Sequence, residues 1–175
     1  MSGEFQKNLW APWRLEYIAG VDEVGDGCFL CHYRDRPDDD AANAVVWRTP
    51  SSLVVLNRWP YTNGHLLVAP TAHKGDMGDL TPDEWAELMG LVQDAVAALQ
   101  HAVHCQGFNI GLNIGRCAGA GLPEHLHIHV VPRWSGDTNF MPVFGQVRVI
   151  PQAIEAVREK LLEAAEELGL PRAGR

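Results

Sequence analysis

The chain has 175 residues, of which 46% are hydrophobic and 21% charged, and its formal net charge is −8. This length is ordinary for one compact domain, and the composition excludes collagen, a coiled coil and wholesale disorder. The acidity disfavours DNA or RNA binding, which depends on basic surface, but allows an anionic small molecule. No apolar run approaches the roughly 18 residues of a membrane-spanning helix, and no signal-peptide pattern opens the chain. We therefore expect a cytoplasmic protein with no membrane or nucleic-acid partner.

The spacing of apolar residues predicts five strands and two helices. In chain order, three strands are expected at residues 44–48, 53–57 and 65–69, a long helix at 82–103, two strands at 108–114 and 125–133, and a C-terminal helix at about 152–168. Thr81 followed by Glu84 is a capping-box signature for the long helix, and Gly169 ends the second helix. This order predicts an α+β domain with a mainly antiparallel five-stranded sheet, one long helix and a C-terminal helix.

Two further segments carry no periodic pattern. Charged residues crowd positions 34–40 and predict an exposed loop there. The final residues resemble a frayed terminus. Because no internal repeat or low-complexity linker interrupts the chain, we expect a single domain over residues 1–170 and a flexible tail over residues 171–175.

Three histidines alternate with apolar residues in the last predicted strand. Successive strand side chains point to opposite faces, so the apolar residues are expected in the core and the histidines on the other face, namely His125, His127 and His129. Three interpretations are solvated histidines, a catalytic metal centre, and nucleophilic catalysis on phosphorus. We favour the third, because no acidic residue follows to complete a hydrolytic metal site and a glycine-rich loop precedes the histidines.

The chemistry of imidazole supports this preference. Neutral imidazole is a good nucleophile near pH 7, and its attack on a phosphate gives a covalent phosphoramidate. A second histidine nearby assists the departing oxygen. Backbone N–H groups of residues 115–121 are expected to cradle the phosphate oxygens.

The segment 125–131 resembles the His-φ-His-φ-His-φ-φ signature of the histidine triad family, where φ is an apolar residue. Further matches are Asn57 eight residues before His65, the pair Pro70-x-x-His73, and the run Gly111-Leu-Asn113-x-Gly115. Residues 9–18 and 131–140 are similar to the bacterial diadenosine tetraphosphate phosphorylase branch of that family. The resemblance covers roughly residues 8–168.

The resemblance implies a role for each matching residue. The nucleophile that takes up AMP would be His127, His129 would assist the leaving oxygen, and His65 would support the site from the adjacent strand. The substrate-binding residues would be Asn57 at the ribose hydroxyls, and at the transferred phosphate Asn113, Gly119, Ala120 and Gly121, with His129 beside it. Alternatively, Asn57 simply ends a strand and His65 is a hydrogen-bonded core residue. At Gly121 the family usually has Ser or Gln, so the phosphate contact there is altered.

The pair Cys28-x-x-Cys31 supplies half of a tetrahedral zinc site. By resemblance to zinc-carrying members of the family, His73 and His125 would complete a structural site. Inert buried thiols and a redox pair are the alternatives. Cys105 and Cys117 lack helpful spacing and are interpreted as core or loop residues.

The resemblance as a whole implies an enzyme that cleaves a dinucleoside polyphosphate through a nucleotidyl-His127 intermediate. Orthophosphate as acceptor would make it a phosphorylase, and water would make it a hydrolase. The alternatives are a purine nucleoside phosphoramidase of the same family and a nucleotide-binding protein without turnover. The expected partners are a nucleotide substrate and a second copy of the chain in a homodimer.

Overall fold

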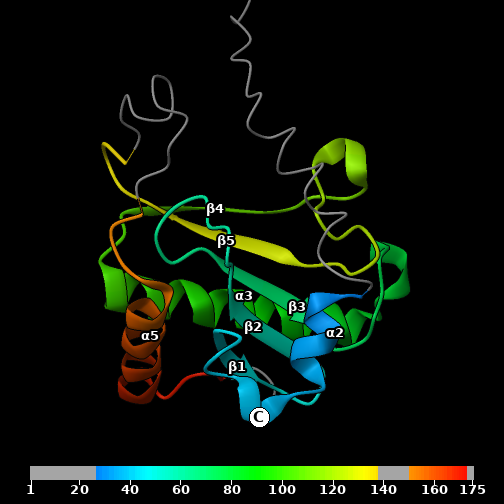
Figure 1. Cartoon of the computed structure of the whole chain (residues 1–175), viewed down its shortest axis with the longest axis horizontal. Helices are drawn as coiled ribbons and strands as arrows, with labels where there is room; N and C mark the ends of the chain where they lie inside the picture. Colours follow the sequence, from blue (N-terminus) through cyan, green and yellow to red (C-terminus); the bar gives the residue numbers. More distant parts are fainter. Residues whose placement is uncertain (1–26, 138–149, 173–175) are drawn as a thin grey trace, which may run out of the picture.

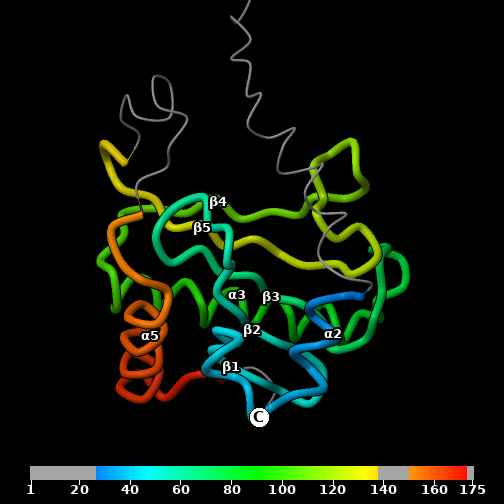
Figure 2. The backbone as a smooth tube through the Cα atoms, viewed as in Figure 1, coloured from blue at the N-terminus to red at the C-terminus, as the bar shows by residue number. Residues whose placement is uncertain are grey.

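The computed structural model describes residues 27–137 and 150–172. Its central element is a five-stranded sheet in the order β1-β2-β3-β5-β4, with every neighbouring pair antiparallel. The strands are β1 (Val45–Arg48), β2 (Ser52–Leu56), β3 (Leu66–Pro70), β4 (Gly107–Leu112) and β5 (Ile128–Arg133). The chain passes through β1, β2 and β3 as adjacent strands and adds β4 and β5 after a long helix (Figure 2).

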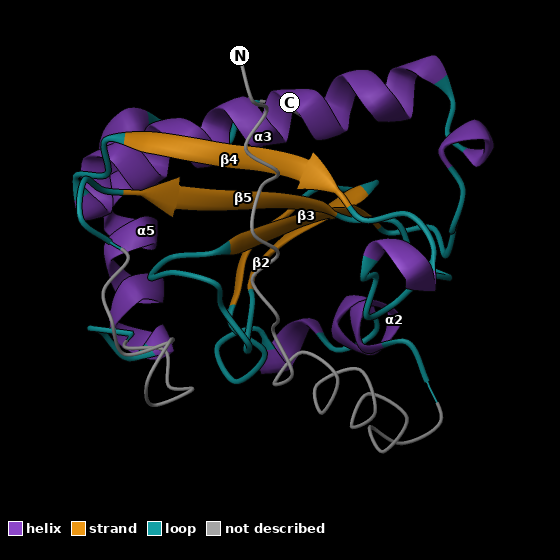
Figure 3. Ribbon diagram, turned by 90° about the horizontal axis from the view of Figure 1, so that it is seen from above, coloured by secondary structure: helices purple, strands orange, loops and turns teal. Residues whose placement is uncertain are grey.

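Helices cover both faces of the sheet (Figures 1 and 3). The α-helices are α2 (Phe29–Arg34), α3 (Pro82–Val103) and α5 (Ile154–Leu168), and the short 3₁₀ helices are η2 (Pro37–Asp39), η3 (Met77–Asp79) and η4 (Arg116–Ala118). The predicted α+β class, with its antiparallel sheet, long helix and C-terminal helix, is confirmed. Among the described residues, no helix combines the length and apolar composition needed to cross a bilayer.

The long helix α3 begins where its sequence signature places it. Thr81 Oγ1 accepts the Glu84 N–H at 3.2 Å, and the Glu84 carboxylate accepts the Thr81 N–H at 2.7 Å, which completes the capping box. The helix ends at His104, whose φ is +50°. Leu88, Leu91 and Leu99 on its inner face are buried in the main hydrophobic core.

The alternation of strand side chains divides the interior into two apolar clusters. One cluster joins α3 and α5 to one face of the sheet, through residues such as Val68 and Val130. The other cluster packs Leu30 and Tyr33 of α2 against Val55 and Leu67 on the opposite face. The sheet therefore has two covered faces, and the candidate site shares the second one with α2.

Some boundaries differ from the predictions. The exposed loop expected at residues 34–40 contains the end of α2 and all of η2, and Asp40 in it forms an ion pair with Arg48. The last strand begins at Ile128, not at residue 125, because the Leu126 N–H donates to the Lys74 carbonyl at 2.7 Å and not to a neighbouring strand.

The termini bear on the predicted domain boundary. Residues 1–26, 138–149 and 173–175 lie outside the described residues, including the segment 9–18 and most of the expected tail. Within residues 171–172, the Arg172 backbone N–H and guanidinium donate to the buried Asp94 carboxylate at 2.6 and 2.9 Å. A single domain over residues 1–170 with a tail beyond it stays a prediction.

The loop between β2 and β3 leads the chain directly into the site. The Asn57 N–H donates to the His65 carbonyl at 2.8 Å, which closes the loop. Gly64, next to His65, has a φ of +75°, and a Cβ there would lie 3.0 Å from Leu99 Cδ2. Only glycine meets both conditions without strain.

We predict that Gly64→Ala lowers the free energy of unfolding by about 2 kcal/mol, because it adds a strained backbone to a crowded position. Urea unfolding followed by circular dichroism measures the change. Gly78→Ala is the matched control, since a Cβ at Gly78 meets nothing within 4 Å, and it should stay within about 0.5 kcal/mol of the wild type. Equal stabilities of the two variants would contradict the interpretation of Gly64.

Candidate active site and metal centre

The orientation of His127 is set by a backbone carbonyl. Its Nδ1 lies 2.9 Å from the His125 carbonyl oxygen. Because a carbonyl only accepts, Nδ1 carries the proton and donates it, and Nε2 keeps its lone pair. Burial lowers the pKa of His127 below its ordinary value, so the ring stays neutral near pH 7. The geometry thus presents a neutral imidazole with a nucleophilic Nε2.

His65 and His129 form a hydrogen-bonded pair beside His127. His65 Nε2 and His129 Nδ1 are 2.9 Å apart. On its other side, His65 Nδ1 accepts the Tyr61 backbone N–H at 3.2 Å, and the Asn57 amide nitrogen approaches the same atom at 3.3 Å. The proton of His65 therefore sits on Nε2 and is donated to His129 Nδ1.

This chain of contacts leaves His129 with its own proton on Nε2. Asn113 Nδ2 lies 3.4 Å from that nitrogen, beyond the usual length of a hydrogen bond, whereas the shorter contact at His65 comes from the Tyr61 backbone N–H, which can only donate. Tyr61 therefore fixes the direction of the chain. Burial lowers the pKa of His129 to about 4, and the neighbouring His127 contributes.

The two site histidines thus offer complementary nitrogens. The ring centroids of His127 and His129 are 4.9 Å apart, and the rings meet edge to face at 69°. His127 presents a lone pair, and His129 presents an N–H donor. This arrangement suits attack on phosphorus with a hydrogen bond to an oxygen of the same phosphate.

The glycine-rich loop after β4 differs from the expected cradle. The N–H groups of Ala118, Gly119 and Ala120 donate to carbonyls within the loop, at 3.2, 2.9 and 3.3 Å. Asn113 Nδ2 contacts the Gly119 carbonyl at 3.5 Å, which ties the loop to His129. The Gly121 N–H forms no hydrogen bond within the described residues. Of Gly119, Ala120 and Gly121, the last therefore has the N–H that can contact a phosphate.

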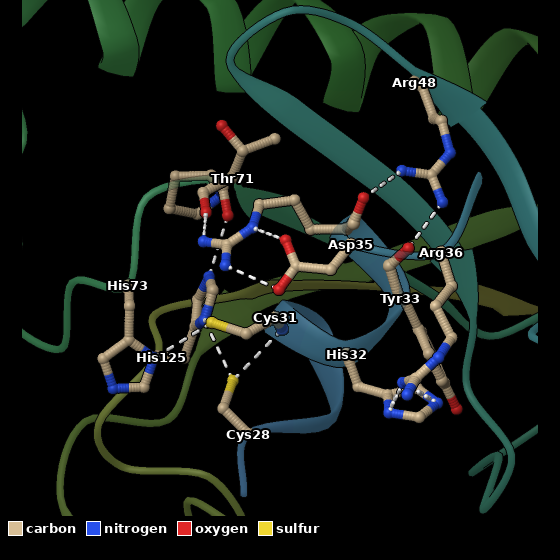
Figure 4. A network of polar contacts seen from close by, with 12 residues as sticks. Cys28, Cys31, His32, Tyr33, Asp35, Arg36, Arg48, Thr71, His73 and His125 are labelled. Carbon is tan, nitrogen blue, oxygen red and sulfur yellow. Dashed lines mark hydrogen bonds and ion pairs between the residues drawn. The ribbon is translucent and has the colours of Figure 1, made fainter.

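Four side chains converge on a second centre (Figure 4). The ligand atoms of Cys28, Cys31, His73 and His125 all lie within 4.8 Å of one another. His125 Nδ1 is 3.1 Å from Cys28 Sγ and 3.6 Å from Cys31 Sγ, and His73 Nδ1 is 3.3 Å from Cys31 Sγ. Sulfur and nitrogen ligands of a tetrahedral zinc stand about 3.6 Å apart. These residues therefore fit a metal ion.

The tautomer of His125 also suits a ligand. Its Nε2 donates to the Pro70 carbonyl at 2.8 Å, which leaves the Nδ1 lone pair directed at the sulfur atoms. Burial lowers the pKa of His125 to about 4 and raises that of the Cys28 thiol to about 11. A bound cation would stabilise the thiolate that burial disfavours.

The local structure explains why the cluster forms. Cys28 caps α2, and its Sγ accepts the Cys31 N–H at 3.4 Å, so both thiols lie at one end of that helix. The loop that carries His73 packs closely on the turn before His125. The closeness is clear at Gly75, where an added Cβ would lie 3.0 Å from the Pro123 carbonyl oxygen. Segments far apart in the sequence meet at this point.

The structure separates the three triad histidines into two groups. His127 and His129 join His65 at one centre, while His125 contacts the two cysteines and His73 at the other. The expectation that one strand carries all three is wrong, since only His129 lies in β5. Sequence reasoning missed Tyr61, for which no periodic or motif signal existed.

Comparisons with known proteins agree with this geometry. The HIT domain family matches residues 39–136, and the chain belongs to the HIT family. It is 39% identical over 160 residues to the AP-4-A phosphorylase of Mycobacterium tuberculosis, which covers 89% of this chain and 82% of that protein. It is 33% identical over 93 residues to the bis(5'-nucleosyl)-tetraphosphatase (asymmetrical) of Schizosaccharomyces pombe, covering 53% and 50% of the two chains.

Solved structures show the same fold. A Zn-bound histidine triad family protein from Mycobacterium smegmatis superposes with a TM-score of 0.67 at 28% identity, covering 82% of this chain and 96% of that one. A hypothetical histidine triad nucleotide-binding protein from Sulfolobus tokodaii gives a TM-score of 0.66 at 27% identity, over 81% and 93% of the two chains.

The buried, neutral His129 predicts a specific loss of stability in acid. Its pKa is about 4 in the folded chain and 6.5 ordinarily. Below pH 6.5 the unfolded chain therefore binds a proton that the folded chain does not, and stability falls as the pH drops toward 4. His129→Gln removes this contribution, so its free energy of unfolding should change less between about pH 7.5 and about pH 5 than that of the wild type.

Urea unfolding at the two pH values measures this difference. The same pH dependence in His129→Gln and the wild type would show that His129 titrates normally in the folded chain.

Proposed function

We propose that this chain cleaves dinucleoside polyphosphates by transferring a nucleotidyl group to His127 and then to an acceptor. The observation that carries the proposal is the hydrogen bond from His127 Nδ1–H to the His125 carbonyl, which leaves the Nε2 lone pair for attack. Similarity to the AP-4-A phosphorylase of Mycobacterium tuberculosis supports diadenosine tetraphosphate as the substrate.

In the first half-reaction, His127 Nε2 forms a bond to the α-phosphorus of the substrate. The bond from that phosphorus to the bridging oxygen breaks, and its electron pair goes to the oxygen. The departing nucleotide leaves as a phosphate anion, which needs no proton near pH 7 because phosphate monoesters have a second pKa of about 6. The His129 Nε2–H stabilises the developing charge with a hydrogen bond.

In the second half-reaction, the acceptor replaces His127 at phosphorus. Orthophosphate brings an anionic oxygen, so its attack restores His127 without moving a proton. Water has to lose a proton to a base, and His129 Nε2 already carries one. The tautomer of His129 therefore favours orthophosphate, which makes the enzyme a phosphorylase that yields ADP and ATP.

The substrate-binding residues are assigned in keeping with these contacts. Asn57 is assigned to the ribose hydroxyls, and Asn113 to the transferred phosphate. Of the loop residues Gly119, Ala120 and Gly121, the last supplies the N–H that contacts the phosphate, since the other two N–H groups donate within the loop. Glycine at position 121 confines this contact to the backbone.

We also propose that the metal centre holds a structural zinc ion. Two thiolates and two imidazoles are ligands that zinc prefers, and the Zn-bound relative from Mycobacterium smegmatis supports the choice of metal. Zinc supplies a cross-link among three chain segments when bound. His125 then acts twice, as a ligand through Nδ1 and as the carbonyl acceptor for His127.

A homodimer is proposed through the β4 edge of the sheet, where β4 pairs with β5 alone among the described strands. β4 is an edge strand, and its residues Asn109, Ile110 and Gly111 are exposed. Ile110, at 46% exposure, is a large apolar residue on that edge. Pairing of two such edges would bury it and satisfy the backbone groups there.

The proposed function predicts a product pattern. Diadenosine tetraphosphate with orthophosphate should give ADP and ATP, whereas His127→Ala should lose at least about a thousandfold in turnover, because it removes the nucleophile. Chromatography separates the products, and mass spectrometry of the acid-quenched enzyme without acceptor detects AMP on His127. His101→Ala is the control.

Three outcomes would contradict the proposal. The first is full turnover by His127→Ala, which would contradict the nucleophile. The second is the formation of AMP and ATP by the wild type in saturating orthophosphate, which would contradict the acceptor. The third is cleavage of adenosine phosphoramidate but not of diadenosine tetraphosphate by the wild type, which would contradict the substrate. The last would instead support a phosphoramidase.

For the zinc proposal, we predict that Cys31→Ser weakens zinc binding at least about tenfold and lowers the urea midpoint of unfolding, because one of four ligands is lost. Metal analysis after dialysis against a weak chelator measures retention. Cys117→Ser is the matched control, since Cys117 is exposed and lies outside the cluster. Equal zinc retention in the two variants would rule out this site.

A further inference from the structure

The ring of Tyr61 packs against the histidine pair of the active site. Its centroid lies 4.6 Å from that of His65 and 5.8 Å from that of His129, and it is tilted by only 23° from the His129 ring. Tyr61 is 39% exposed, whereas the two histidines are buried. The ring therefore covers the pair on a side that reaches solvent.

The backbone of Tyr61 acts on the same pair. Its N–H donates to His65 Nδ1 at 3.2 Å, so His65 donates from Nε2 to His129 Nδ1 at 2.9 Å. His129 must then carry its remaining proton on Nε2. One residue thus both fixes the direction of the hydrogen bonds and shields them from water.

We propose that Tyr61 determines the acceptor of the second half-reaction, because it holds His129 as a hydrogen-bond donor and keeps water from the His65–His129 pair. This inference rests on the proposed nucleotidyl-His127 intermediate. Tyr61 is a positioning residue, since it acts through His65 and His129.

The chemistry of the two acceptors explains why the tautomer matters. When orthophosphate attacks, a phosphorus–oxygen bond forms, the phosphorus–nitrogen bond breaks, and the electron pair returns to His127 Nε2 with no proton transfer. When water attacks, one of its protons must pass to a base. His129 can accept that proton at Nε2 only if its own proton sits on Nδ1, which requires His65 Nε2 to accept.

Removal of the Tyr61 ring would permit that second arrangement. Water would reach His65 and compete with the Tyr61 backbone for Nδ1, so that either nitrogen of His65 could carry the proton. His129 would then populate both tautomers, and one of them has the Nε2 lone pair that a hydrolytic step needs.

The test compares product ratios in three variants. Each is given diadenosine tetraphosphate and orthophosphate, and AMP from hydrolysis is measured against ADP from phosphorolysis. Tyr61→Ala should raise the AMP to ADP ratio about tenfold, because the second half-reaction gains a general base. Tyr61→Phe keeps the ring and should stay within about twofold of the wild type.

Trp59→Ala is the matched control for loss of an aromatic side chain from the same loop. Trp59 is 55% exposed, and its backbone N–H donates to Asn57 Oδ1 at 2.9 Å, a hydrogen bond that alanine keeps. This variant should leave the AMP to ADP ratio unchanged. An unchanged ratio in Tyr61→Ala, with the nucleotidylated intermediate still formed, would overturn the acceptor role alone.

A second measurement does not depend on turnover. Nitrogen-15 spectra of labelled histidine rings should show the wild-type His129 protonated at Nε2, and both tautomers in Tyr61→Ala. A wild-type ring protonated at Nδ1, or an unaltered ring in Tyr61→Ala, would overturn the inference. If the wild type forms no nucleotidylated His127, the proposed function fails and the acceptor role fails with it.

Discussion

The hydrogen bond from His127 to the His125 carbonyl is the constraint on which the rest of the site depends. It determines that Nε2 of His127 is the nitrogen with the available lone pair. The acceptor is a backbone carbonyl oxygen whose position is itself fixed. His125 is held at both ring nitrogens, by the Pro70 carbonyl and by the cysteine sulfurs. A peptide carbonyl anchored in this way cannot turn away from the nucleophile without breaking contacts in two other segments.

The sheet makes this arrangement possible because successive side chains of a strand point to opposite faces, which places apolar and polar residues on different sides. Ile128 and Val130 point into the core under α3, while His129 between them points to the face that carries α2. In the register, His129 lies opposite Leu67 of β3 and Gly111 of β4, and the glycine leaves room beside the His129 ring. The site thus lies at the edge of the second apolar cluster, where His129 of β5 meets the loops that carry His65 and His127.

The sequence predicted most of the fold and most of the side chains that the structure brings together at the two centres. The start of α3 and its capping box followed from Thr81 and Glu84, its end followed from the spacing of apolar residues, and the pairing of His125 with the two cysteines followed from the family resemblance. What it did not predict depends on tertiary contact. The Leu126 N–H donates to the Lys74 carbonyl, so β5 begins later than predicted. The N–H groups of Gly119 and Ala120 donate to carbonyls of their own loop, and the Tyr61 ring packs on His65. None of these contacts produces a pattern of residue spacing that a single sequence would reveal.

The burial of neutral histidines also resolves a conflict between this acidic chain and an anionic substrate. With a net charge of −8, long-range attraction cannot draw a polyphosphate to the site. Two cations of the described region are already paired, Lys74 with Glu84 and Arg133 with Asp137. Short-range N–H donors at the site contribute to recognition, and they act strongly only where water is excluded. The same exclusion keeps His127 unprotonated, so the property that binds the phosphate also preserves the nucleophile.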